Sequence, residues 1–151
     1  KIFLSQFKMY LTDEYFMREA LKEAQKAYEI REVPVGAIVV SNNRIIARAH
    51  NQIEQLKDAT AHAEMLALTA AFSYVGGKYL SASTLYVTLE PCCMCGGAIC
   101  WAQLGRLVFG AQDLKKGYRT IGRHLLHPRT KVTAEVLSDE AAGYLTKTNK
   151  K

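Results

Sequence analysis

All four cysteines of this 151-residue chain lie within nine consecutive positions, and this clustering restricts how the chain can fold. They are Cys92, Cys93, Cys95 and Cys100. A secreted disulfide scaffold spreads its cysteines along the chain to connect distant loops, which one tight cluster cannot do. We therefore expect an apolar core to hold the domain, and the cluster suits a reducing compartment and a metal or redox role.

The composition suits such a core, because 49% of the residues are hydrophobic and 23% are charged, as in ordinary globular domains. No run approaches the roughly 18 apolar residues of a membrane-spanning helix, and Ile2–Leu4 is too short for a signal-peptide core. We expect a single cytoplasmic domain over residues 1–151 with no membrane partner. Residues 1–9 are expected to be disordered or foreign to the natural protein, and 147–151 to form a basic tail.

Apolar periodicity and turn residues divide the chain into alternating helices and strands. The predicted helices cover residues 12–31, 61–75, 92–103 and 138–146, and the predicted strands cover residues 35–40, 44–50, 84–89, 106–111 and 131–137. Residues 51–60 are expected to form a polar loop. The first two strands form an antiparallel hairpin through Asn42 and Asn43, and strands separated by single helices are expected to pair in parallel. The sequence thus predicts an α/β fold with three layers, α/β/α, around a five-stranded mixed sheet.

The positive charge of the chain is concentrated in one segment. Twenty basic and fourteen acidic residues give a net charge of +6. Residues 105–131 contain seven basic residues and one acidic residue, Asp113, whereas the rest of the chain contains thirteen of each. This basic segment is a candidate surface for phosphate groups, although a solvated basic loop has the same composition.

Two motifs stand at the starts of predicted helices: His62-Ala63-Glu64 and Pro91-Cys92-Cys93-Met94-Cys95. Cys92 and Cys95 are three residues apart, so their thiols share one helix face, and a helix N-terminus favours the thiolate that binds metal. One imidazole and two thiolates would make a three-ligand zinc site. The fourth position of the tetrahedron would then be open to water, as in catalytic zinc sites.

Other interpretations of these motifs remain open. The two cysteines could form a redox pair or be buried, and a histidine at a helix start often caps or packs. In a structural zinc site, Cys93 or Cys100 would be the fourth ligand and Glu64 would have no role. Glu64 favours catalysis, because a carboxylate can move the proton of an activated water during hydrolysis of a C–NH₂ group. Helical spacing alone does not bring His62 and Glu64 together.

From about residue 12 to 145, the chain resembles the cytidine and deoxycytidylate deaminase superfamily, and within it the tRNA adenosine deaminases. It carries their H-x-E and P-C-x-x-C signature. The matching stretches are Val33–Ala37, Asn51, Thr60–Glu64, Thr88–Ala98, Phe109–Ala111 and Leu126–Pro128. Three places depart from the family pattern. Gln112 stands where an arginine is common, Tyr118–Leu125 does not match the best-known members closely, and residues 144–151 lack the usual aromatic and basic turn.

The resemblance implies a homodimeric zinc enzyme that converts adenosine to inosine at the wobble position of a tRNA anticodon stem-loop. His62, Cys92 and Cys95 would hold Zn²⁺, and Glu64 would be the catalytic proton shuttle. Asn51 would hydrogen-bond the nucleoside, and the Ala63 N–H would lie close to the water on the metal. The residues expected to contact RNA are Asp113, Lys115, Lys116, Arg119 and His127.

A deaminase of small molecules, such as guanine, cytosine or cytidine, is the alternative. It would share every zinc-site residue but would not need the basic segment. The apolar residues Cys93, Met94, Ile99 and Trp101 are candidates either for a dimer surface or for the core.

Overall fold

The computed structural model describes residues 11–148. The expectations for residues 1–9 and for the last three residues of the basic tail lie outside this range. The helices are α2 (Asp13–Glu29), α3 (Ile53–Leu56), α4 (Ala63–Val75), α5 (Cys93–Trp101) and α6 (Ser138–Thr148), with 3-10 turns η1 (Tyr118–Thr120) and η2 (Arg123–Leu125). The strands are β1 (Gly36–Ser41), β2 (Arg44–His50), β3 (Ser83–Leu89), β4 (Arg106–Ala111) and β5 (Lys131–Thr133).

Local signals start and stop these elements as predicted. The Thr12 hydroxyl accepts the Tyr15 N–H and caps α2. Asn42 and Asn43 both have positive φ, 54° and 63°, in the two-residue turn between β1 and β2, which matches the twist of a hairpin. Gly76 ends α4 in the left-handed conformation.

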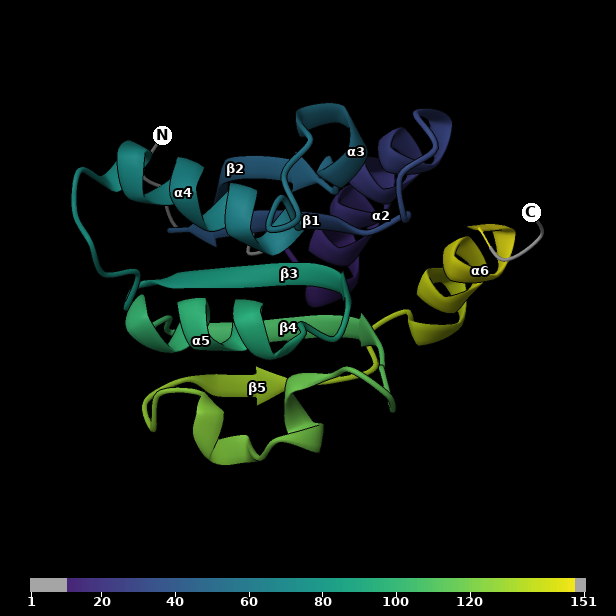
Figure 1. Cartoon of the computed structure of the whole chain (residues 1–151). Helices are drawn as coiled ribbons and strands as arrows, with labels where there is room; N and C mark the ends of the chain where they lie inside the picture. The colour runs from purple at the N-terminus through teal and green to yellow at the C-terminus, as the bar shows by residue number, and fades with distance from the viewer. Residues whose placement is uncertain (1–10, 149–151) are drawn as a thin grey trace, which may run out of the picture.

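The strands form one mixed sheet in the order β2-β1-β3-β4-β5 (Figure 1). The antiparallel hairpin and the parallel pairing of β3 with β4 across α5 are as predicted. The prediction that the strands on either side of α4 pair with each other is wrong, because β3 lies antiparallel to β1. The continuous apolar run of β1 is buried and takes a central place, whereas Arg44 and Arg48 of β2 are exposed, which suits an edge strand.

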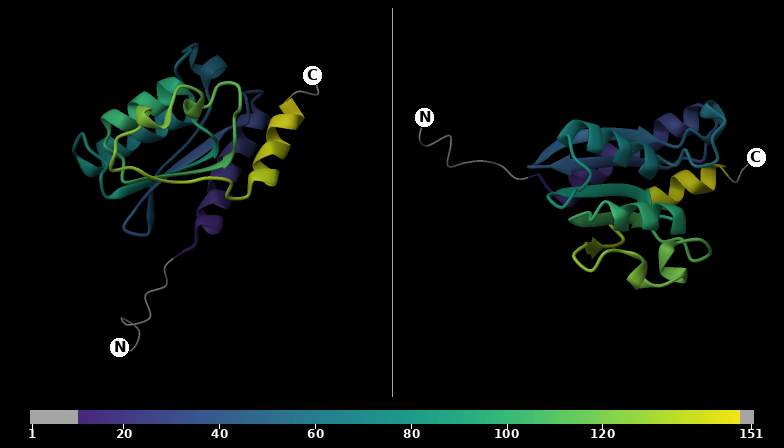
Figure 2. Two further views of the ribbon diagram at one scale, coloured as in Figure 1. Left: turned by 90° about the horizontal axis from the view of Figure 1, so that it is seen from below. Right: turned by 60° about the vertical axis from the view of Figure 1, so that its left-hand side comes forward.

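Helices cover both faces of the sheet and complete the predicted three layers (Figure 2). On one face, Val39, Val87 and Phe109 pack against α4 and α5. On the other face, Ile38 and Val108 pack against α2, and α6 lies beside α2. The alternation of the side chains along each strand produces these two cores.

Gly36 allows α2 to approach the start of β1 closely. A Cβ atom at this position would collide with the carbonyl oxygen of Ala20. The Gly36 N–H donates to the Thr88 hydroxyl over 3.1 Å, inside the protein. The start of β1 is therefore attached to the end of β3, where the candidate site lies.

Two predicted elements differ in extent. The last strand ends at Thr133 rather than Leu137, because Glu135 and Leu137 have positive φ and turn the chain toward α6. The expected polar loop at residues 51–60 contains the short helix α3. No helix in the described part of the chain combines the length and apolar character needed to cross a membrane.

Candidate active site

The ends of several elements meet at one end of the sheet. Val35 precedes β1, Asn51 follows β2, Glu90 follows β3 and Asp113 follows β4. Helices α4 and α5 begin at the same end (Figure 1). The carboxyl ends of the strands of an open α/β sheet are where such proteins usually bind ligands.

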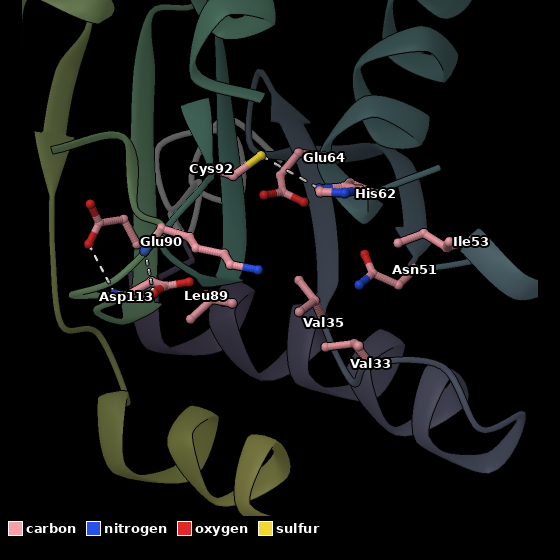
Figure 3. Close-up of a pocket in the computed structure, with 11 residues that line it drawn as sticks. Val33, Val35, Asn51, Ile53, His62, Glu64, Leu89, Glu90, Cys92 and Asp113 are labelled. Atoms are coloured by element: carbon pink, nitrogen blue, oxygen red, sulfur yellow. Dashed lines mark hydrogen bonds between the residues drawn. The ribbon is translucent and has the colours of Figure 1, made fainter. Parts of the chain in front are cut away.

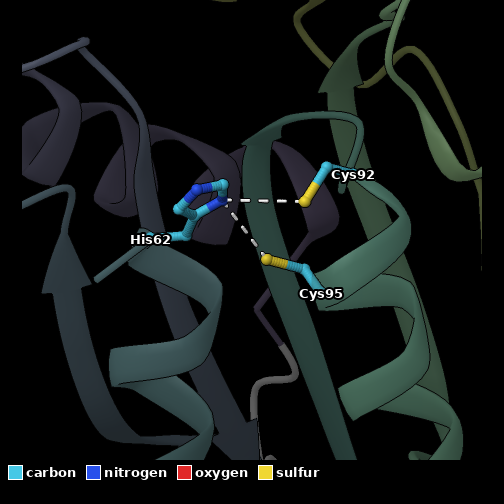
Figure 4. Close-up of side chains that lie close together, drawn as sticks. All are labelled: His62, Cys92 and Cys95. Atoms are coloured by element: carbon cyan, nitrogen blue, oxygen red, sulfur yellow. Dashed lines mark hydrogen bonds between the residues drawn. The ribbon is translucent and has the colours of Figure 1, made fainter. Parts of the chain in front are cut away.

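His62, Cys92 and Cys95 come together there, with one donor atom from each residue within 4.8 Å of the others. The His62 Nδ1 atom lies 3.7 Å from the Cys92 sulfur and 3.6 Å from the Cys95 sulfur. Figure 4 shows the imidazole at the start of α4 facing both thiols at the start of α5. The structure thus groups the three predicted ligands, and their binding of metal stays a prediction.

Backbone conformation explains a convergence that helical spacing did not predict. The sequence placed His62 and Cys92 inside predicted helices. In the structure they instead precede α4 and α5 as N-cap residues with extended backbones. Their side chains therefore leave in directions that an α-helix does not allow. Glu64 and Cys95 belong to the first turns that follow, and Figure 3 shows Glu64 beside His62 and Cys92.

The charges of this cluster are set by burial and by its own hydrogen bonds. Desolvation raises the pKa of the buried Glu64 carboxyl to about 7. The thiol of Cys95 stabilises the neighbouring thiolate and lowers the pKa of Cys92 to about 5, against the effect of burial. The same bond, together with burial, raises the pKa of Cys95.

The donor set fits zinc. Imidazole nitrogen and thiolate sulfur are ordinary zinc ligands, and three of them leave one coordination position open. Among residues 11–148, Cys93 and Cys100 do not join this group. The geometry therefore favours a catalytic site over the structural site with a fourth cysteine.

Asn51 is buried, and its Oδ1 atom accepts the Ala63 N–H over 2.7 Å. Because an N–H must face an acceptor, this bond orients the side-chain amide of Asn51. The amide NH₂ donates to no residue in the described part of the chain, and Asn51 lines the pocket. The Ala63 N–H thus has a partner that the sequence did not indicate, and both substrate-binding roles stay predictions.

A pocket of about 230 Å³ opens in front of this cluster. His62, Glu64 and Cys92 lie at one end of it, and Figure 3 shows both apolar and polar side chains around the remaining space. The apolar lining consists of Val33, Val35, Ile53 and Leu89. The pocket is smaller than the roughly 300–1,000 Å³ sites of drug-sized ligands, and its apolar walls suit a flat ring.

The predicted RNA-contacting residues lie in three different settings. Asp113 and Lys116 line the pocket, and Lys115 is exposed on the same loop. Arg119 forms an ion pair with the buried Glu90. His127 lies in a separate cavity of about 400 Å³ beside Arg123 and His124.

Two buried carboxylates that the sequence did not indicate, Glu32 and Glu90, hold segments that line the pocket. Glu32 accepts the N–H groups of Glu54 and Gln55 and so holds α3, whose Ile53 lines the pocket. Glu90 accepts bonds from the loop that follows β4. In the sequence, Glu90 stands out only as a single acidic residue directly after an apolar strand. Its hydrogen-bond partners, Asp113 and Arg119, are 23 and 29 residues away, so its role could not be inferred.

The family model described as "Cytidine and deoxycytidylate deaminase zinc-binding region" matches residues 11–111. The chain is 52% identical over 104 residues to the tRNA-specific adenosine deaminase of Aquifex aeolicus, covering 69% of each chain. It is 46% identical over 138 residues to the tRNA-specific adenosine deaminase of Bacillus subtilis, covering 88% of this chain and 86% of the other.

A solved structure supports the same comparison. It comes from a study of A-to-I editing by tRNA:A34 deaminases at the wobble position of transfer RNA. It matches this structure with a TM-score of 0.81 and 40% identity, over 87% of this chain and 99% of the other.

Proposed function

Because the chain belongs to the cytidine and deoxycytidylate deaminase zinc-binding family, we propose that it hydrolyses adenosine to inosine at the wobble position of a tRNA anticodon. The observation that carries the proposal is the joint lining of one small pocket by His62, Cys92, Glu64 and Lys116. The first three provide a zinc site with a proton carrier, and Lys116 provides a cation for phosphate. The relatives named above support RNA as the substrate.

His62, Cys92 and Cys95 would hold the zinc, which supplies the Lewis acidity that makes water a nucleophile near neutral pH. Glu64 takes a proton from the attacking water and delivers it to the purine ring nitrogen, while the water oxygen bonds to the ring carbon that carries the amino group. The remaining proton of that hydroxyl then passes to the amino group, which leaves as ammonia as the C–N bond breaks and the carbonyl of inosine forms. Burial, which raises the pKa of Glu64 to about 7, suits a group that both accepts and donates protons.

The remaining pocket residues hold the base. The Asn51 NH₂ is free to donate to the nucleoside, while its carbonyl oxygen is held by Ala63. Val35 and Leu89 contribute apolar walls. An anticodon loop suits this pocket because its unstacked bases can be extruded at low cost.

Of the seven cations in residues 105–131, two are paired within the fold. Arg106 pairs with Asp13, and Arg119 pairs with Glu90. The other five have no acidic partner among residues 11–148 and are available to phosphate groups. They are Lys115, Lys116, Arg123, Arg129 and Lys131.

The proposal is tested by incubating the zinc-loaded protein with an anticodon stem-loop containing adenosine at the wobble position, and separately with free adenosine, guanine and cytidine. We expect inosine from the stem-loop and little ammonia from the small molecules. Efficient turnover of guanine or cytidine without reaction of the stem-loop would instead establish the small-molecule alternative.

Replacing Lys115 and Lys116 together by alanine should weaken stem-loop binding and reduce its salt dependence. Each lost phosphate contact on a single strand lowers the slope of log K against log salt by about 0.7, so the pair should lower it by about 1.4. The measurement is fluorescence anisotropy across a salt series. An unchanged slope would show that these lysines do not contact phosphate.

The same proposal includes a homodimer. Helices α4 and α5 consist mostly of apolar residues, and two of their large side chains, Tyr74 and Trp101, leave 63% and 84% of their surface exposed. Large exposed apolar patches usually mark an interface, and a second copy of this chain would cover them. Sedimentation equilibrium should therefore give twice the 16.8 kDa chain mass, and a monomer at all concentrations would contradict it.

The proposed compartment is the cytoplasm. The four cysteines of the cluster are free in the structure, and two of them must stay reduced to serve as ligands. Reducing compartments maintain thiols in this state.

A further inference from the structure

Glu90 is a buried carboxylate that takes no part in the chemistry described above. It is 3% exposed and stands two residues before the candidate ligand Cys92. Burying a charge is costly unless it is paired and hydrogen-bonded. The contacts that compensate Glu90 therefore show what the residue does.

Four N–H groups from one loop satisfy this carboxylate. Oε1 accepts the Asp113 N–H over 3.1 Å and the Arg119 Nη2–H over 3.0 Å. Oε2 accepts the backbone N–H of Arg119 over 3.2 Å and its Nε–H over 3.1 Å. One side chain thus holds both ends of the loop at residues 113–119, and its paired contacts to the guanidinium are of the strong kind.

The loop is also held against residues 91–95, which carry the two candidate cysteine ligands and are called the ligand segment below. Gly117 pairs with Cys92 in an antiparallel bridge, and the Tyr118 N–H donates to the Pro91 carbonyl over 2.8 Å. A Cβ atom on Gly117 would collide with the Glu90 carboxylate. Glycine is therefore required for the loop to lie this close.

The held loop carries two lining residues of the pocket, Asp113 and Lys116. The Asp113 side chain accepts the N–H groups of Lys115 and Lys116 and shapes the turn between the two held ends. Figure 3 shows Glu90 and Asp113 on the wall of the pocket opposite Asn51 and Ile53. The position of Lys116 relative to the ligands thus depends on the Glu90 contacts.

We propose that Glu90 is a positioning residue, which with Arg119 holds the 113–119 loop against the ligand segment and so places Lys116 where it binds the RNA backbone beside the target base. The assumption that the substrate is RNA rests on the proposed function. Arg119, which the sequence suggested as an RNA contact, acts here through Glu90. Its guanidinium also stacks on the Phe109 ring at 4.9 Å, which fixes it from the protein side.

The test compares wild type with Glu90→Gln, whose amide offers one acceptor fewer and places a donor against donors. We expect KM for the stem-loop to rise about tenfold while kcat changes less than about twofold and zinc content stays the same. A fall in kcat at unchanged KM, or loss of zinc, would overturn the proposal.

A double-mutant cycle separates positioning from general damage. Lys116→Ala should raise KM severalfold in the wild type but have almost no effect in Glu90→Gln, because the lysine is already displaced. Lys131→Ala, on β5 outside the loop, is the matched control and should act equally in both backgrounds. Additive effects of the Glu90 and Lys116 changes would refute the link between them.

Gly117→Ala disturbs the same contacts while Glu90 itself stays unchanged, so it provides a second test in case Glu90→Gln does not fold. It should reproduce the rise in KM, whereas Gly77→Ala, where a Cβ meets nothing within 4 Å, should not. A normal KM for Gly117→Ala would contradict the proposal.

Amide hydrogen exchange distinguishes this inference from the proposed function. The Asp113 and Arg119 amides should exchange slowly in wild type and at least about tenfold faster in Glu90→Gln, whatever the substrate is. Absence of inosine in the wild type would reject the proposed function. Unchanged exchange of these amides would reject the role of Glu90.

Discussion

Replacing Glu64 by glutamine should lower inosine formation about a thousandfold while zinc remains bound. Glutamine has nearly the same shape but cannot accept the proton of the attacking water or return it to the leaving amine. Proton transfer by a positioned side chain contributes roughly 10²–10⁴-fold to a rate. The measurement is single-turnover deamination of the stem-loop, with the zinc content of the same samples determined by atomic absorption.

The structure makes this prediction selective. Glu64 is buried in the pocket but is not among the three clustered donors His62, Cys92 and Cys95. Stem-loop affinity should therefore stay near its wild-type value in Glu64→Gln. Retained activity would show that Glu64 does not transfer protons in the reaction, and loss of zinc would show that Glu64 is a zinc ligand.

Replacing Cys92 or Cys95 by serine should abolish both zinc binding and activity. A serine hydroxyl is a poor substitute for thiolate, and even changes outside the ligand set commonly weaken metal binding by about 10–100-fold. We expect zinc affinity to fall by more than roughly 100-fold, measured by competition with a chelator.

The other two cysteines are matched controls for this experiment. Cys93 is exposed and Cys100 is half-buried, and neither joins the donor cluster in the described part of the chain. Cys93→Ser and Cys100→Ser should each keep one zinc per chain. Loss of zinc in either variant would show that this cysteine is a fourth ligand and that the zinc site is structural.

Local signals explain why most elements could be predicted. Thr12, the Asn42-Asn43 turn and Gly76 act on neighbouring residues, so their effects can be inferred over a few positions. The partner of β3 could not be inferred in this way. Its pairing with β1 depends on which strand is buried on both faces, a property of the assembled sheet.

The same division applies to the site. The three donors and Glu64 were recognised because their types and spacing are distinctive. The reason for their convergence was not visible, since it depends on the extended backbones of His62 and Cys92 just before their helices. The ion pair of Arg119 could not be inferred either, because Glu90, its partner, is 29 residues away in sequence. The expected contact of Arg119 with RNA stays a prediction.

The clustered cysteines and the His-Glu motif by themselves predicted the chemistry of this protein: a zinc-type donor set beside a carboxylate that could carry protons. Residue types and short spacings suffice for such a prediction, because a metal selects its ligands by the kinds of atoms they offer. Only the tertiary structure decided which cations of the basic segment are paired and which lie at the pocket. It assigns Arg106 and Arg119 to ion pairs and brings Lys116 to the pocket, because burial and long-range pairing determine which charges remain available to a substrate.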